Sequence, residues 1–187
     1  MNNRFNPKKL DKLNNPERLK DIPPEYIWQK LDMAETGTLV DIGAGTGFFS
    51  IPFQSLSGGK IYACDISETM INWMKKNITP DHPEIIPVQM KSVKVPLPDS
   101  STDLVYMITL HHELEYPLEN LREAHRLLRK GGKIFIVDWK KIEMQTGPSI
   151  DIRCTAEDVS IQLKDAGFRN ISIDESLPKF FLIIGEN

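Results

Sequence analysis

Leu39-Val-Asp-Ile-Gly-Ala-Gly-Thr-Gly47 joins a short apolar run directly to three glycines at alternate positions. The apolar run has the composition of a buried strand, and the residues after it have the pattern of a helix. Glycines at such a junction let the backbone turn sharply and approach a ligand closely. The segment therefore predicts a strand-to-helix turn that holds a nucleotide-like ligand, although a tight turn without a ligand would use the same residues.

Short apolar runs alternate with helical patterns from Thr38 onward. This alternation is typical of a parallel sheet with helices on both faces. Strands are predicted at 39–42, 60–65, 85–89, 104–108 and 133–138, with helices at 49–55, 68–77, 119–128 and 156–166. Two further runs, 170–175 and 180–184, have only a short proline-containing segment between them and predict a closing pair of strands.

Size and composition indicate one domain with an N-terminal extension. The chain has 187 residues, of which 40% are hydrophobic, so it can bury one substantial core. Residues 1–24 are polar and interrupted by prolines, which predicts an arm that packs onto a body. A helix is predicted from Pro24 to near Gly37. The expected division is therefore an arm and helix over residues 1–37 and a ligand-binding domain over residues 38–187.

Charge and cysteine usage disfavour several classes of partner. A net charge of −3, with scattered lysines and arginines, gives no attraction to nucleic acid. The chain has no secretory signal pattern and no membrane span, so a cytoplasmic protein is expected. Cys64 and Cys154 lie far apart without CxxC spacing, which predicts neither a disulfide nor a zinc site. The oligomeric state is left open.

Asp65 ends the second predicted strand, beside the glycine segment in a parallel sheet. A carboxylate at this edge can accept hydrogen bonds from both ribose hydroxyls. The alternative is an N-cap for the helix that follows, a position that Ser67 can also fill. The spacing G-x-G-x-G, with Asp41 before it, differs from the dinucleotide fingerprint G-x-G-x-x-G and disfavours NAD.

At this point the sequence resembles the class I S-adenosylmethionine-dependent methyltransferases, in particular the small-molecule branch that includes the ubiquinone and menaquinone biosynthesis methyltransferases. The resemblance covers about residues 38 to 184. It rests on Val40-Asp-Ile-Gly-Ala-Gly-Thr-Gly-Phe48, Asp65-Ile-Ser-Glu-Thr-Met70, Leu97-Pro-Asp-Ser-Ser-Thr-Asp103, Leu110-His-His112, Leu121-Arg-Glu-Ala-His-Arg-Leu-Leu-Arg-Lys-Gly-Gly132 and Leu163-Lys-Asp-Ala-Gly-Phe168. Jointly these motifs are specific, although each alone is not.

The resemblance implies a doubly wound, Rossmann-like sheet of seven mostly parallel strands whose last strand is antiparallel. It also implies that S-adenosylmethionine is the cofactor. The matched positions would contact its aminoacyl and ribose portions (Gly43, Ala44, Gly45), its methionine end (Asp41), its ribose hydroxyls (Asp65), its adenine face (Ile66) and the region beneath its sulfonium (Thr109).

Two positions depart from the family pattern. Many relatives have an acid after the third strand to meet the adenine amino group, whereas this chain has Met90-Lys-Ser92-Val93, so Ser92 and Val93 would have to supply the contact. Thr102 stands where the family usually has phenylalanine, which we expect to affect local packing only.

His111 and His112 follow the fourth predicted strand at the ligand edge, where a base would be needed. Histidine titrates near neutral pH, so both are candidate catalytic residues. We favour His112, because successive residues leaving a strand face opposite ways and the pocket-facing histidine of the family falls near here. The alternative is that they line the cofactor pocket or cap the next turn. No metal is expected, because consecutive ligands are poorly spaced for one ion.

Asp138 and Trp139 end the fifth strand at the same edge and are candidate substrate contacts. The family often uses the N-terminal region to exclude water, so the arm with Phe5, Arg18 and Tyr26 is a candidate lid. The chain has no room for a large recognition insertion, which favours a small or medium organic acceptor. A nicotinamide-dependent oxidoreductase and a non-catalytic S-adenosylmethionine-binding protein remain alternatives.

Overall fold

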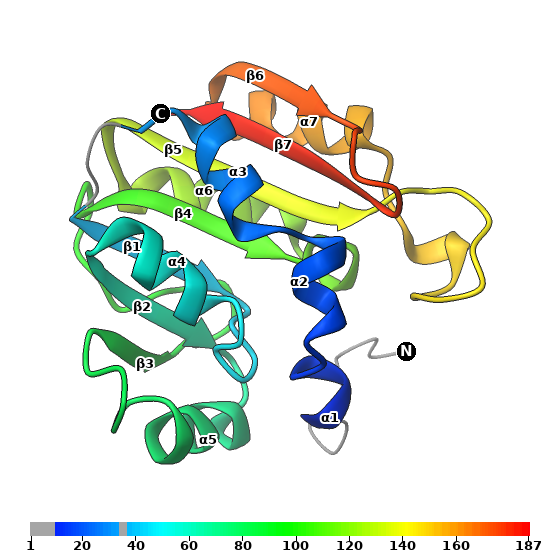
Figure 1. Ribbon diagram of the computed structural model, residues 1–187. Coiled ribbons are helices and arrows are strands. Elements are labelled where there is room, and N and C mark those ends of the chain that lie inside the picture. The colour runs from blue at the N-terminus through cyan, green and yellow to red at the C-terminus, as the bar shows by residue number, and fades with distance from the viewer. Residues whose placement is uncertain (1–9, 34–36) are drawn as a thin grey trace.

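Seven strands form one sheet in the computed structural model, which describes residues 10–33 and 37–187. The strands are β1 (Thr38–Ile42), β2 (Lys60–Asp65), β3 (Ile85–Gln89), β4 (Thr102–Ile108), β5 (Leu128–Trp139), β6 (Arg169–Asp174) and β7 (Phe180–Glu186). Their order across the sheet is β3-β2-β1-β4-β5-β7-β6 (Figure 1). The first five strands in this order pair in parallel. β7 lies antiparallel between β5 and β6, which confirms the predicted fold and its antiparallel last strand.

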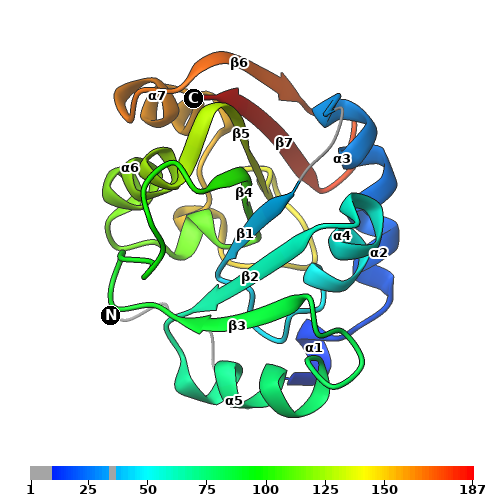
Figure 2. The ribbon, with the colours of Figure 1, turned by 90° about the vertical axis from the view of Figure 1, so that its left-hand side faces the viewer.

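Helices cover both faces of the sheet. They are α1 (Leu10–Leu13), α2 (Glu17–Asp21), α3 (Pro24–Leu31), α4 (Ser50–Ser57), α5 (Glu68–Asn77), α6 (Pro117–Leu127) and α7 (Ala156–Asp165), with short 3-10 turns η1 (His111–Glu113) and η2 (Ile150–Ile152). In Figure 2, α6 and α7 lie on one side of the sheet, and α3 and α4 lie on the other. Among these described helices, none combines the length and apolar character needed to cross a bilayer.

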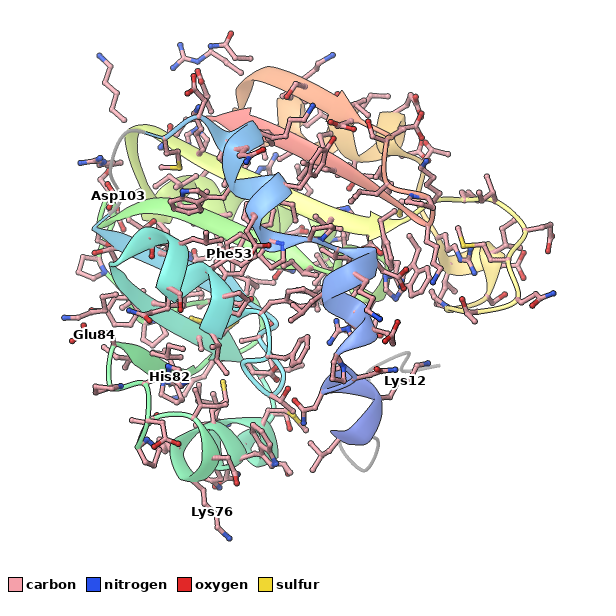
Figure 3. All side chains as sticks on the ribbon, in the orientation of Figure 1. Lys12, Phe53, Lys76, His82, Glu84 and Asp103 are labelled. Atoms are coloured by element: carbon pink, nitrogen blue, oxygen red, sulfur yellow. The ribbon has the colours of Figure 1, made fainter. Side chains whose placement is uncertain are left out.

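The two cores follow from the alternation of side chains along each strand. All seven residues of β4 are buried, with Tyr106 in the core beneath α3, α4 and α5 and Met107 in the core beneath α6 and α7. Phe53 points from α4 toward the sheet (Figure 3), and its ring centroid lies 5.0 Å from that of Tyr106 and 5.2 Å from that of Phe135. These aromatic contacts hold α4 on β4 and β5.

The N-terminal segment lies at the edge of the sheet where β4 and β5 end (Figure 1). Tyr26 Oη donates a hydrogen bond of 2.6 Å to Asp174, and Lys179 Nζ lies 2.7 Å from Asp21. These contacts tie α2 and α3 to the C-terminal strands. The predicted extension of the third helix to near Gly37 is wrong, because Asp32 adopts a left-handed conformation with φ of 46° directly after Leu31.

Candidate functional site

A cavity of about 1380 Å³ opens at the carboxyl ends of β1, β2, β4 and β5. The strand order changes direction between β1 and β4, which is where open α/β sheets bind their ligands. The cavity is lined by the loop after β1, the ends of the neighbouring strands, residues 145–148 and parts of α1 and α2. Its volume exceeds that of a typical single-ligand pocket, which is roughly 300–1,000 Å³. The cavity is therefore large enough for more than one small ligand.

The glycine segment turns tightly along one wall of the cavity. Gly43, Gly45 and Gly47 have φ values of 74°, 58° and 73°, in the left-handed region that favours glycine. The amides of Gly43 and Ala44 both donate to the carbonyl oxygen of Cys64, at 2.8 and 3.0 Å, which pins the loop to β2. The predicted residues Gly43, Ala44 and Gly45 all line the cavity. The loop thus presents bare backbone to a ligand.

Asp65 is held in place by backbone amides on either side. Its Oδ2 accepts from Gly45 N at 2.9 Å, and its Oδ1 accepts from Ser67 N at 2.8 Å. Burial raises the pKa of Asp65, although these two amide hydrogen bonds oppose the rise. Each carboxylate oxygen keeps accepting capacity toward the cavity, as binding to a pair of ribose hydroxyls requires. Ser67 occupies the N-cap of α5, but its side chain makes no capping hydrogen bond.

Asp41 lies beneath the glycine loop with 3% of its surface exposed. Ser50 Oγ donates a hydrogen bond of 2.6 Å to Asp41 Oδ2. Burial raises the pKa of Asp41 to about 7, against the opposing effect of Ser50, and the nearby charge of Asp65 adds to the rise. The carboxyl group therefore titrates near neutral pH, unlike an exposed aspartate.

The predicted adenine contacts gather on the β2 and β3 side of the cavity. Ile66 is 42% exposed and lines the cavity together with Ser92 and Val93. An exposed isoleucine at this place can pack against a flat ring. The loop that carries Ser92 and Val93 is anchored by Glu123 of α6, whose carboxylate accepts from Lys94 Nζ at 2.7 Å and from the backbone amide next to Lys94 at 2.9 Å.

His112 lies on η1 and lines the cavity. Its Nδ1 lies 2.7 Å from Asp138 Oδ1, and its backbone amide donates to Asp138 Oδ2 at 3.0 Å. Burial lowers the pKa of His112, but the hydrogen bond and charge of Asp138, together with the charge of Glu113, outweigh burial and raise the pKa above 6.5. A proton on Nδ1 facing Asp138 leaves Nε2 as the basic atom.

Asp138 is 2% exposed and lies behind His112, outside the lining of the cavity. Its Oδ1 also accepts from Trp139 N at 2.7 Å, so both of its oxygens are used within the protein. The predicted contact of Asp138 with substrate is thus replaced by a contact with His112, because the strand register turns the carboxylate inward. Trp139 does line the cavity, and its ring centroid lies 4.3 Å from that of Phe180.

His111 faces the other side of η1. It is 2% exposed, its Nε2 lies 2.7 Å from Gln162 Oε1 in α7, and it does not line the cavity. Burial lowers the pKa of His111, although the hydrogen bond to Gln162 opposes this effect. Of the two candidate bases, only His112 is therefore in place to meet a ligand in the cavity.

Two arginines help to build this site: Arg18, which was named from the sequence as part of the candidate lid, and Arg153, which was not selected. Arg18 of α2 donates to Thr109 Oγ1 at 3.1 Å, across the end of β4, and it lines the cavity with Thr109. Arg153 follows η2 and donates to the carbonyl oxygens of residues 140, 142, 146 and 148, which shapes the loop after β5. Neither set of hydrogen bonds was predictable from the sequence, because only the fold brings the partners together.

The other predicted lid residues differ in their placement. Tyr26 bonds to Asp174 and does not line the cavity. Phe5 lies outside the described residues. Lys12, which was not among the predicted lid residues, lines the cavity from α1 and is labelled in Figure 3. Among the side chains that the structure describes, no group of three or more histidine, cysteine or acidic residues is arranged to hold a metal ion.

Comparison with known proteins identifies a family. A family model described as a methyltransferase domain matches residues 40–136. The solved structure of a SAM dependent methyltransferase from Aquifex aeolicus has 31% sequence identity and a TM-score of 0.90, and the match covers 97% of this chain and 98% of that one. The residues that the family model matches include the glycine segment, Asp65, Thr109 and His112.

Curated relatives match over a shorter part of their length. The ubiquinone/menaquinone biosynthesis C-methyltransferase UbiE of Laribacter hongkongensis is 26% identical over 134 residues, which are 67% of this chain and 54% of that protein. The demethylmenaquinone methyltransferase of Chlamydia trachomatis is 32% identical over 109 residues, or 57% of this chain and 46% of that protein. The chain spans about half the length of the curated relatives it matches.

Proposed function

This chain belongs to the methyltransferase domain family, and we propose that it transfers a methyl group from S-adenosylmethionine to a small or medium organic acceptor. One observation carries the proposal. A glycine loop and an amide-held carboxylate lie at one end of a cavity whose other end holds a histidine backed by a buried aspartate. The first pair suits a nucleoside, and the second suits proton removal from an acceptor.

The residues fit the cofactor part by part. Gly43, Ala44 and Gly45 offer backbone to its aminoacyl and ribose portions, and Asp65 offers a carboxylate to its ribose hydroxyls. The adenine would pack on Ile66 beside Ser92 and Val93, while Asp41 and Thr109 would lie toward the methionine end. When bound, S-adenosylmethionine supplies an electrophilic methyl group on a sulfonium centre. The protein's task is then to align the acceptor and exclude water.

His112 acts as the base in this proposal. Its Nε2 takes the proton that the acceptor atom loses as it gains the methyl group, and Asp138 stabilises the resulting imidazolium through Nδ1. An acceptor with a weakly acidic hydroxyl, amine or carbon needs such help. The aromatic pair Trp139 and Phe180 gives this end of the cavity an apolar wall, which suits an organic acceptor over a highly charged one.

The N-terminal residues 1–37 act as the lid in the same proposal. α1 and α2 lie over the strand ends, and Thr46 Oγ1 of the glycine segment donates a hydrogen bond of 2.7 Å to Asn14 Oδ1. This contact joins the lid to the loop that would hold the cofactor. We further expect the protein to act on its small-molecule acceptor in the cytoplasm.

Calorimetric titration with S-adenosylmethionine, S-adenosylhomocysteine and NADH tests the cofactor part of the proposal. We expect both adenosyl compounds to bind and NADH not to bind. A metabolite extract incubated with methyl-labelled cofactor should then yield a labelled small molecule, which identifies the acceptor. Binding of NADH alone would support the oxidoreductase alternative, and cofactor binding without any labelled product would support a non-catalytic binding protein.

A further inference from the structure

Arg18 is a cation directed into the cavity. Its Nη1 donates to the carbonyl oxygen of Leu13 at 2.7 Å, and its Nη2 donates to Thr109 Oγ1 at 3.1 Å. Its guanidinium carbon lies 4.8 Å from the ring centroid of Phe49 and 5.7 Å from that of Phe48. A guanidinium has five N–H donors, so these two hydrogen bonds leave donor capacity toward the cavity.

Among the side chains that the structure describes, Arg18 has no carboxylate partner within ion-pair distance. Burial lowers the pKa of Arg18 to about 10, while the charge of Asp41 opposes the decrease, so the guanidinium is still protonated at neutral pH. A cation withdrawn from water is costly unless an anion accompanies it. An anionic ligand in the cavity would supply the charge partner that no described carboxylate provides within ion-pair distance.

Arg153 shows that a buried guanidinium does not always need an anionic partner. It is 4% exposed, but its guanidinium makes five hydrogen bonds to the carbonyl oxygens of four loop residues. Those carbonyls satisfy its donors, and its role is to hold the loop. Arg18 has two hydrogen bonds in a cavity that is large enough for a ligand.

The strand order shows which part of a ligand would reach Arg18. Asp65 ends β2, the glycine loop follows β1, and Thr109 follows β4 on the opposite side of β1. A ligand whose ribose lies on Asp65 and which crosses the glycine loop arrives at Thr109 and Arg18. The part of S-adenosylmethionine beyond its ribose is a methionine chain that carries an α-carboxylate. A guanidinium can bind a carboxylate through two parallel hydrogen bonds.

We propose that Arg18 binds the α-carboxylate of the cofactor, so that the N-terminal segment completes the cofactor site. The proposal rests on the proposed function, because it takes S-adenosylmethionine as the ligand. Arg18 would then join the lid to the methionine end, as Thr46 and Asn14 join the lid to the glycine loop. A protein without this segment would hold the nucleoside but would lose recognition of the amino-acid end.

Decarboxylated S-adenosylmethionine lacks only the carboxylate in question and is therefore the sharpest probe. We expect calorimetric titration of the wild-type protein to show about 30-fold weaker binding of this compound than of S-adenosylmethionine, as loss of hydrogen bonds to a charged group predicts. In the variant Arg18→Met this preference should fall below about threefold, because only binding of the carboxylate-bearing ligand is weakened. Arg18→Lys should restore part of the preference.

Two lysines serve as controls. Lys20→Met removes an exposed cation from the same helix, one that is paired with Glu17, and should leave both affinities unchanged. Lys12 also lines the cavity, so loss of the preference in Lys12→Met and its retention in Arg18→Met would overturn the proposal. Equal binding of the two ligands by the wild-type protein would overturn it without any variant. Failure of the wild-type protein to bind either ligand would instead contradict the proposed function.

Discussion

The glycine-loop end of the cavity, where we propose that the cofactor binds (the cofactor side), is built mainly from backbone. The His112 end, where we propose that the acceptor binds (the acceptor side), is built from side chains that hold one another. On the cofactor side the glycine loop is pinned to β2 by main-chain hydrogen bonds, and Asp65 is fixed by two amides. On the acceptor side His112 is held by Asp138, and the loop after β5 is held by Arg153. The two sides should therefore fail independently when single residues are changed.

This difference has a chemical basis. Backbone amides placed by strand ends give every member of a fold the same rigid surface for the same cofactor. Side chains on a loop can be exchanged without altering the sheet, so the acceptor side can serve different substrates. A substitution on one side, combined with a measurement on the other side, thus tests whether the two sides of the cavity are independent.

Replacing His112 with Ala should have the largest effect and should affect only the acceptor side. Turnover of a labelled acceptor should fall by about 10²- to 10⁴-fold, the usual contribution of a positioned base. S-adenosylhomocysteine affinity, measured by calorimetry, should change less than about twofold, since Asp65 and the glycine loop are untouched. His82→Ala is the matched control, because His82 precedes β3 at the other end of the sheet from the cavity (Figure 3).

The pH profile checks the role of His112 separately. Because its pKa is raised above 6.5, kcat/KM of the wild-type protein should rise with pH through an inflection above that value. Asp138→Asn removes the charge that raises this pKa and should move the inflection to lower pH. An unchanged profile in His112→Ala would exclude His112 as the base and would leave it as part of the cavity wall.

Gly43→Ala should weaken binding on the cofactor side and leave the acceptor side unaffected. A Cβ at Gly43 would lie 2.6 Å from Leu110 Cδ2, and φ is 74°. Overpacking and left-handed strain together should weaken S-adenosylhomocysteine binding by up to about 100-fold in calorimetry. Gly58→Ala is the matched control, because Gly58 has φ of 65° but no atom within 4 Å of an added Cβ. Equal loss of affinity in both variants would mean that general strain, and not the loop, is responsible.

The difference between the two sides of the cavity also explains how far the sequence could predict the structure. All seven strands and the four helices predicted after residue 38 are present, because each arises from a local apolar period and local turn residues. The glycine loop at the cavity edge was predictable for the same reason, since its glycines and Asp41 lie within nine consecutive residues. Helix α3 was predicted too long, because the left-handed turn at Asp32 contains no glycine that would mark it in the sequence.

The acceptor side could be predicted only in part. His112 and Asp138 were both selected, but not their pairing, because 26 residues separate them and the register of β4 and β5 brings them together. Arg18 meets Thr109 across 91 residues. Contacts of this kind depend on tertiary packing, and a single sequence contains no periodicity that reveals them.

Asp41→Asn should change stability with a defined dependence on pH. The pKa of Asp41 is raised in the folded state from 3.8 to about 7, so its contribution is fully present below about pH 4 and is lost as the pH rises through 7. A tenfold change in proton affinity corresponds to about 1.4 kcal/mol, so the loss of folding free energy amounts to a few kcal/mol. Urea unfolding of the ligand-free protein at pH 5 and pH 8 should show a smaller difference for Asp41→Asn than for the wild type. An equal difference would mean that Asp41 does not titrate in this range.

Arg153→Met should have the smallest effect, which should be confined to the acceptor side. Its carbonyl partners belong to one loop, and they can turn to water once the arginine is gone, so we expect only about tenfold faster hydrogen exchange there. Exchange at residues 140–148 should rise, while exchange at residues 43–47 and S-adenosylhomocysteine affinity stay unchanged. Arg169→Met, at an exposed position on β6, is the control. If exchange in the glycine loop rises with that of the acceptor loop, the two sides of the cavity form one cooperative unit, and the acceptor loop could not vary independently of the cofactor site.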